Sequence, residues 1–126
     1  MVSSVISATP AGYDAEIIEV EGDTSKGLPT LQIVGMGNKA IDESKERVRS
    51  AIKNSLLEFP TKKITINLAP AEIPKDGTHF DLPIAISILI LSGQLHQRDI
   101  KDSAFVGELS LNGDIRPVRG ILNIVE

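Results

Sequence analysis

NLAPAEIPKDGTHFDLPIAISILILS, which is Asn67–Ser92, decides the fold of this chain. Its second half, Leu82–Leu91, is almost wholly apolar. Asp81 is a good N-cap, Pro83 is tolerated in a first turn and Gly93 can end a helix, so this half is predicted to be helical. Because the helix has no polar stripe, it must be buried on most sides. Its length is far below the roughly 20 residues that a bilayer requires.

The first half of the stretch is a loop that precedes this helix. Pro70, Pro74 and Gly77 interrupt regular structure there. Free amides and the helix dipole meet at such a point, so it is a common place for chemistry. Asp76 and Asp81 flank the loop and could bind a metal ion, but turn and capping roles account for both, and no metal site is predicted.

Alternating apolar and polar residues predict a sheet around the helix. Residues 22–27 are interpreted as a polar loop, with a turn at Pro10-Ala11-Gly12. Asn112-Gly113 predicts a two-residue hairpin turn with positive φ at both positions. The predicted strands are Ser3–Ala8, Tyr13–Glu21, Leu28–Val34, Lys63–Leu68 and a hairpin of Ala104–Leu111 with Asp114–Val118.

A second helix is predicted at Lys39–Asn54, with Asn38 as its cap and Ser44 filling a gap in its apolar face. Glu43 and Arg47, four residues apart, can pair on its surface. The helix follows Gly35-Met36-Gly37, a turn that could bind phosphate. A structural turn is favoured, because a third glycine at dinucleotide spacing and a P-loop lysine are both missing.

Composition limits the function classes. A chain of 126 residues is one domain, and without cysteine it has no disulfide, thiolate nucleophile or zinc–thiolate site. The formal charge of −4 disfavours a domain that binds nucleic acid unaided. The first residues, MVSSVISATP, lack the pattern of a signal peptide, so we expect a cytoplasmic protein that contacts no membrane.

Two blocks resemble the protease domain of Lon. PKDGTHFD, at residues 74–81, resembles the PKDGPSAG loop that carries the catalytic serine, and GELSLNGDIRPVRGIL, at 107–122, resembles the block that carries the catalytic lysine. Three longer stretches, at 27–55, 59–86 and 105–122, resemble the N-terminal domain of ComM-type (YifB-type) Mg-chelatase-like AAA+ proteins more closely. This second resemblance covers nearly the whole chain.

The resemblance implies an α+β (α/β two-layer) domain with the ribosomal protein S5 domain 2-like fold that Lon-like protease domains share. Residues 1–126 are then a single Lon-like domain of a longer protein. A downstream Mg-chelatase-like AAA+ module would bind ATP and Mg, whereas no cofactor is expected in this fragment. The whole protein is expected to be a ring-forming, hexameric DNA helicase that moves branched DNA in natural transformation.

Both members of the Lon serine–lysine dyad are replaced. The nucleophile position holds His79 and the lysine position holds Leu122. Thr78 and His79 could form a rebuilt site, but adjacent side chains seldom point at each other. Ser110 keeps a hydroxyl near the dyad position without a base. We therefore expect no catalytic residue in this fragment.

Basic residues suggest a nucleic-acid contact. Lys62 and Lys63 precede one strand, and Arg116 and Arg119 follow the hairpin turn. If they share a face, they form a patch that tracks phosphates, although scattered solvated charges are the simpler interpretation. Three hypotheses remain: a non-catalytic domain for ring assembly with weak DNA contact, a degenerate Lon-like peptidase, or a peptide- or partner-binding module.

Overall fold

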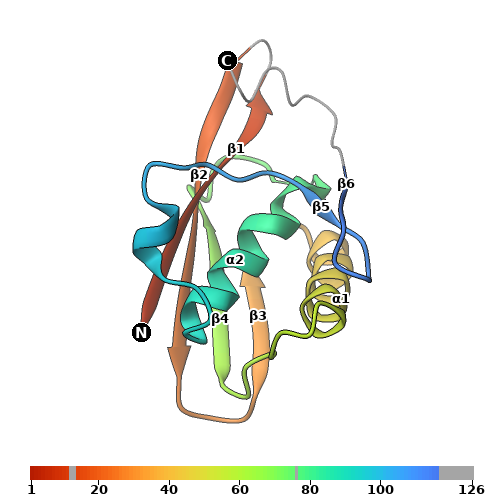
Figure 1. The fold of residues 1–126 in the computed structure, drawn as a ribbon. Coiled ribbons are helices and arrows are strands. Elements are labelled where there is room, and N and C mark those ends of the chain that lie inside the picture. The colour runs from red at the N-terminus through yellow and green to blue at the C-terminus, as the bar shows by residue number, and fades with distance from the viewer. Residues whose placement is uncertain (12–13, 76, 117–126) are drawn as a thin grey trace.

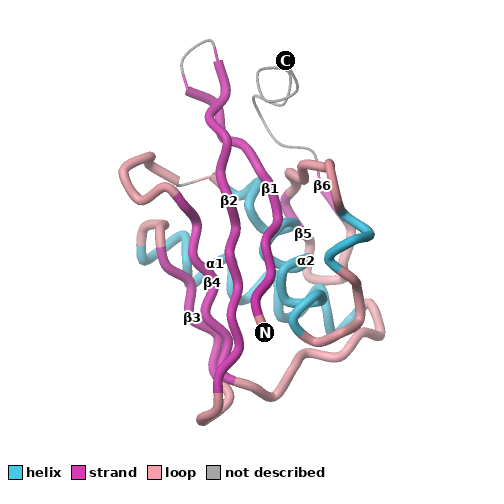
Figure 2. The backbone as a smooth tube through the Cα atoms, turned by 90° about the vertical axis from the view of Figure 1, so that its left-hand side faces the viewer, coloured by secondary structure: helices cyan, strands magenta, loops and turns pink. Residues whose placement is uncertain are grey.

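The computed structural model describes residues 1–11, 14–75 and 77–116 as a two-layer α+β structure. Its sheet has the strand order β1-β2-β4-β3, in which only β3 and β4 are parallel. Figures 1 and 2 show both long helices on one side of this sheet. The α+β two-layer prediction is confirmed. The strands and α-helices are β1 (Val2–Ala11), β2 (Asp14–Ser25), β3 (Thr30–Val34), α1 (Asn38–Asn54), β4 (Lys63–Ala69), α2 (Asp81–Leu91), β5 (Glu108–Leu109) and β6 (Ile115–Arg116).

Helix α2 is the centre of the core, as its sequence predicts. Ile84 and Ile88 are fully buried, and the helix packs across β1, β2 and β4. Its Ser87 hydroxyl forms a buried hydrogen bond with Ser3 of β1. Gly22 of β2 lies directly beneath this pair, because a Cβ there would be 2.5 Å from Ser3 Oγ and 2.6 Å from Ser87 Oγ. A glycine therefore lets the helix approach the sheet closely.

Strands β1 and β2 are longer than predicted. Residues 22–25, interpreted as loop, continue β2, because Gly22 pairs with Ile66 and Ser25 with Lys63 of β4. That pairing partner lies far along the chain and leaves no local signal. Pro10, expected in a turn, extends β1, which is an edge strand in the sheet order and therefore tolerates a residue without an N–H. Gly12 lies outside the described residues.

The outer edge of β1 is covered by the segment that follows α2. The Gln97 side chain accepts a hydrogen bond from Ser4 N at 2.9 Å and donates one to Ser4 O at 2.6 Å. Phe105 N donates to Ile6 O at 2.9 Å, and Ala104 forms a bridge with Ile6. The strand expected from Ala104 to Leu111 is thus reduced to this bridge and to β5.

The β5–β6 hairpin has a different turn from the one predicted. Gly113 has a φ of 99°, but Asn112 does not have a positive φ. Gly113 N donates to Ser110 O at 3.0 Å, and Ser110 N donates to Asp114 O at 2.9 Å. This is the pattern of a three-residue loop with a glycine bulge. A Cβ on Gly113 would overlap Ser55 Oγ, so the turn packs tightly on the end of α1.

Candidate functional site

The loop before α2, which resembles the Lon serine loop, is held by a buried lysine. Lys75 Nζ donates to Pro70 O and Ile73 O, each at 2.6 Å. Lys75 is 3% exposed, and this burial lowers its pKa, against a smaller opposing effect of Glu72. The ammonium group therefore links two backbone carbonyls of its own loop and stabilises the conformation of that loop. Asp76, which follows it, lies outside the described residues.

His79, at the Lon nucleophile position, is a packed side chain. It is buried, its ring lies 4.1 Å from the Phe80 ring, and a Cβ on Gly77 would be 2.5 Å from His79 Nδ1. Its carbonyl accepts a hydrogen bond from Gly107 N at 2.9 Å. Thr78, in contrast, is exposed. The two neighbours of the possible rebuilt site thus lie in different environments.

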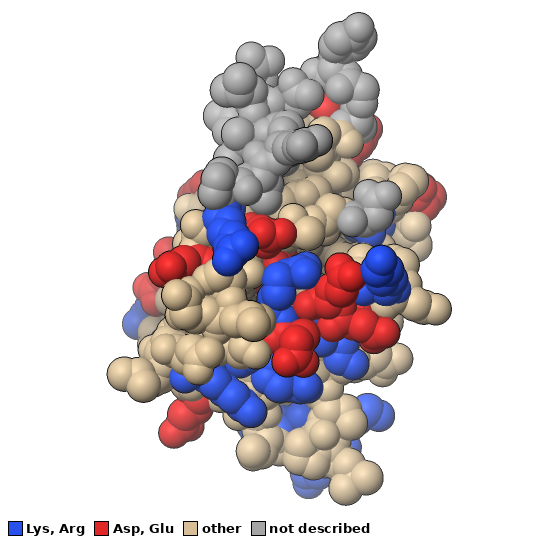
Figure 3. Space-filling view, turned by 90° about the vertical axis from the view of Figure 1, so that its right-hand side faces the viewer, with Lys and Arg blue, Asp and Glu red and all other residues tan. Residues whose placement is uncertain are grey.

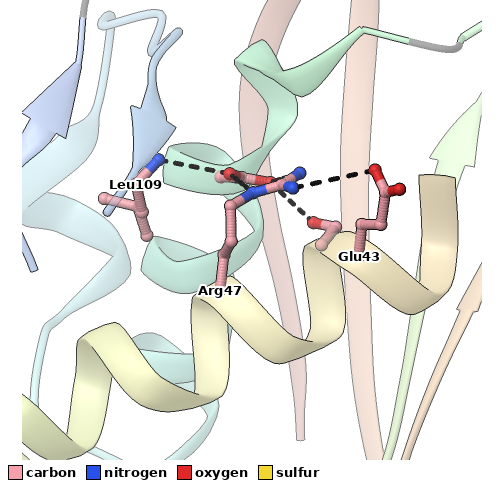
Figure 4. A network of polar contacts seen from close by, with 5 residues as sticks. Glu43, Arg47 and Leu109 are labelled. Carbon is pink, nitrogen blue, oxygen red and sulfur yellow. Dashed lines mark hydrogen bonds and ion pairs between the residues drawn. The ribbon is translucent and has the colours of Figure 1, made fainter. Parts of the chain in front are cut away.

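Asp81 is the charged centre of the site, in a role that the sequence analysis missed. Its carboxylate accepts a hydrogen bond from Ser44 Oγ at 2.8 Å and two from Arg47, at 2.6 Å from Nε and 3.1 Å from Nη2. Leu109 N donates a further bond at 3.2 Å. Figure 4 shows these groups converging from α1, α2 and β5. We call Ser44, Arg47, Asp81 and Leu109 the Asp81 cluster.

The prediction that Asp81 caps α2 is wrong. Phe80 occupies the N-cap position without a side-chain bond, and the Asp81 side chain turns to the cluster instead. Asn38 likewise does not cap α1, because Gly37 is its N-cap. Both oxygens of Asp81, 1% exposed, are used by protein donors. Among the described residues, the structure contains no group of three side chains that could hold a metal ion.

The electrostatics of the Asp81 cluster favour the ion pair. The side-chain hydrogen bond to Asp81 holds the pKa of Arg47 above its ordinary value, against desolvation. The negative charges of Glu108 and Glu43 act in the same direction. Glu43 lies 4.0 Å from Arg47, as the spacing on α1 predicts. Two polar side chains of α1, Ser44 and Arg47, thus join this helix to Asp81 of α2.

The glycine turn before α1 has a structural reason. Gly35 has a φ of 105°, and a Cβ there would be 2.6 Å from Leu68 O on β4. Only glycine adopts this backbone without strain at so close an approach. The interpretation of this segment as a tight strand-to-helix turn is therefore supported by its geometry.

The four predicted basic residues do not all come together. Lys63 begins β4 and Lys62 precedes it, whereas Arg116 lies on β6. In Figure 1, β4 begins at the lower end of the sheet and β6 lies above α1. Arg116 shares its surface hollow with Asp114. Arg119, like the dyad position Leu122, lies outside the described residues. Figure 3, which faces the α1 side, shows basic and acidic side chains intermixed.

One basic residue was missed because it lies in the segment interpreted as loop. Lys26 lines a surface hollow together with Lys62, Thr24, Ser25 and Gly27. We call these five residues the lysine hollow. The signal in the sequence was weak, since the two lysines are far apart along the chain and the pairing of Ser25 with Lys63 brings them together.

Comparison with known proteins confirms the resemblance. Competence protein ComM of Haemophilus influenzae is 44% identical over 118 residues, 94% of this chain and 23% of that protein. The uncharacterized protein YifB of Escherichia coli is 48% identical over 122 residues, 97% of this chain and 24% of that protein. A Lon protease of Chloroflexus aurantiacus is 34% identical over 121 residues, 90% of this chain and 14% of that protein.

The chain thus spans about a quarter of the length of ComM and YifB. None of the described helices is both long and apolar enough to cross a membrane. The family model for subunit ChlI of Mg-chelatase matches residues 20–126, which is most of the sequence. The chain therefore belongs to the family of subunit ChlI of Mg-chelatase.

Proposed function

We propose that this chain is the non-proteolytic Lon-like domain of a ComM-type AAA+ ATPase that moves branched DNA in natural transformation. In this proposal the domain arranges subunits around a hexameric ring in the cytoplasm and contacts DNA weakly. ATP and Mg are bound by a module outside these 126 residues. The similarity to competence protein ComM, over 94% of the chain, is the observation that carries the proposal.

The geometry supports a non-proteolytic role. A serine–lysine mechanism needs an accessible hydroxyl beside an unprotonated lysine. Here the nucleophile position holds buried His79, and the nearby buried lysine, Lys75, donates to two loop carbonyls. Ser110 is also engaged, because Asp114 N donates to its hydroxyl at 3.0 Å. The loop is therefore built as a structural element.

The proposal is tested on the longer protein, with and without residues 1–126. We expect the deletion to abolish ring assembly, measured by sedimentation, and ATP-driven movement of a synthetic four-way DNA junction. The intact protein with Glu43→Gln, which removes one surface charge, is the control and is expected to assemble and move the junction as the wild type does. A deleted protein that assembles and moves the junction as well as the intact one would contradict the proposal.

A degenerate peptidase is the second candidate, favoured by the similarity to Lon protease and by an exposed Thr78 beside His79. Incubation of the 126-residue chain with casein tests it. We expect no cleavage. Cleavage that disappears in Thr78→Ala, but persists in a variant of another exposed hydroxyl such as Thr30→Ala, would establish the peptidase instead.

A further inference from the structure

The lysine hollow lies where β2 passes into the turn toward β3. It is an open surface hollow with a volume of about 410 Å³. Its lining consists of two lysines, two hydroxyl residues and a glycine, without an aromatic side chain or a carboxylate. It therefore has room for a hydrated phosphate but no surface on which a base could stack.

The lysines at this place, Lys26, Lys62 and Lys63, are exposed and take no part in the ion pairs of the described residues. The chain as a whole carries a formal charge of −4, so this cluster opposes the net charge. An unpaired group of lysines attracts polyanions by releasing the counterions of their phosphates.

The backbone of the turn adds donors to this charge. Gly27 has a φ of 146°, a conformation that favours glycine. A Cβ on Gly27 would be 3.6 Å from Lys63 Cδ, so Lys63 runs beside the turn and belongs to the same surface. Across the described residues, no hydrogen bond uses the N–H groups of residues 26–28. Lysines, hydroxyls and free amides are the groups that contact phosphate oxygens.

The sheet itself limits how a polyanion can approach. Glu19, Glu21 and Asp23 are exposed on β2, on the face that Figure 2 shows uncovered by helices. Phosphates laid along that face would meet this row of carboxylates. A nucleic-acid strand is therefore directed to the end of the sheet, where the lysines lie, rather than to its open face.

We infer that the lysine hollow binds phosphodiester groups of a nucleic-acid backbone, without reading base sequence. This inference rests on the proposed function and names the surface through which the domain contacts DNA. It replaces the patch of Lys62, Lys63, Arg116 and Arg119 with one centred on Lys26, Lys62 and Lys63.

The test is fluorescence anisotropy of a short single-stranded oligonucleotide with the 126-residue chain over a salt titration. Two phosphate contacts contribute a slope of about 1.4 in the plot of log affinity against log salt, at about 0.7 each. We expect Lys26→Gln/Lys62→Gln to lose about this slope and to bind several-fold more weakly at low salt. The matched control, Lys39→Gln/Lys101→Gln, removes the same charge at exposed positions elsewhere and is expected to retain the slope.

Two further arms separate the outcomes. In two-dimensional NMR, the amide signals of Ser25 and Gly27 are expected to move with the oligonucleotide, and ADP is expected to compete only weakly. DNA binding that is retained in Lys26→Gln/Lys62→Gln but weakened in Arg116→Gln contradicts the lysine hollow as the binding surface. The proposal that the domain contacts DNA is then retained. Equal losses in the hollow and control variants show a general charge effect and also overturn it. Tight competition by ADP identifies a free-nucleotide site instead, and a wild-type chain that does not bind DNA contradicts both the hollow and the domain's DNA contact.

Discussion

The Asp81 cluster and the lysine hollow are two groups of charged residues with opposite surroundings. Asp81 is 1% exposed and accepts four hydrogen bonds from three neighbouring residues. The lysines of the hollow are exposed and lack ion pairs in the described structure. Charge that the protein satisfies internally joins its helices and the β5–β6 hairpin, whereas unsatisfied charge is available to a partner. The two regions should therefore respond to substitution in different assays.

The largest expected effect is on stability, from Asp81→Ala. The substitution leaves Arg47 without its carboxylate and removes the acceptor of Ser44 and Leu109. Removing one partner of a fully buried ion pair costs about 3–5 kcal/mol, and because the Arg47 side chain is 21% exposed we expect a loss toward the lower end of that range. Urea denaturation followed by circular dichroism measures this loss. An Asp81→Ala chain that unfolds at the wild-type urea concentration would show that the cluster does not stabilise the contact of α1, α2 and β5.

Lys75→Met tests whether the hydrogen bonds of a buried ammonium group to loop carbonyls also stabilise the fold. We expect a loss of about 1–3 kcal/mol, because the carbonyls of Pro70 and Ile73 lose their donor. Burial lowers the pKa of Lys75 below its ordinary 10.5. Between that lowered value and 10.5 the unfolded chain binds more protons, so this group makes stability rise with pH in that window.

Lys75→Met should remove that rise in stability. The measurement compares the unfolding free energy of the wild type with that of Lys75→Met at a series of alkaline pH values. Lys39→Met, at an exposed position, is the matched control and should leave the pH dependence unchanged. Identical pH dependence in Lys75→Met and the wild type would mean that the loop does not perturb this ammonium group.

Glu43→Gln probes the rim of the Asp81 cluster. Glu43 lies 4.0 Å from Arg47, and its side chain is 51% exposed. Exposed pairs on a helix contribute only about 0.3–0.5 kcal/mol. We expect a stability change of that size, shrinking further at high salt. A loss of stability comparable to that of Asp81→Ala would show that Glu43, and not only Asp81, is essential to the ion pair with Arg47.

The smallest expected change in stability comes from Lys26→Gln/Lys62→Gln. Surface substitutions without partners usually change stability by less than about 0.5 kcal/mol. The same pair of changes carries the largest expected effect on DNA affinity, while Glu43→Gln should leave that affinity nearly unchanged. Thermal melting measures stability and anisotropy measures DNA affinity on the same samples. A strong loss of stability in Lys26→Gln/Lys62→Gln would contradict the distinction between the two regions.

The sequence predicted those parts of the fold that depend on local signals. The apolar run Leu82–Leu91 predicted a buried helix, and Gly93 predicted its end. Gly93 has a φ of 79° just after the last residue of α2. The Asp81 cluster could not be found in this way, because Ser44 and Asp81 are 37 residues apart. Asp81 also carried a local signal, the N-cap, that pointed to a different role.

A usable hint was present on α1. Ser44 interrupts the apolar face of that helix, and Arg47 follows it by three residues, so both project from neighbouring positions. A hydroxyl and a guanidinium on one helix surface call for an acceptor elsewhere in the fold. The length of β2 lacked even such a hint, because Gly22 and Ser25 become strand only through pairing with β4.

The long sequence separations within the Asp81 cluster have a consequence for folding kinetics. Asp81 is 34 residues from Arg47 and 28 from Leu109, so the cluster closes only when α1, α2 and β5 have already met. Contacts of this kind tend to form after the rate-limiting step, and their loss then accelerates unfolding without slowing refolding. In stopped-flow experiments, Asp81→Ala should leave the refolding limb nearly unchanged and raise the unfolding rate by about tenfold for each 1.4 kcal/mol lost. The cluster would then set how long the native domain persists once it has formed.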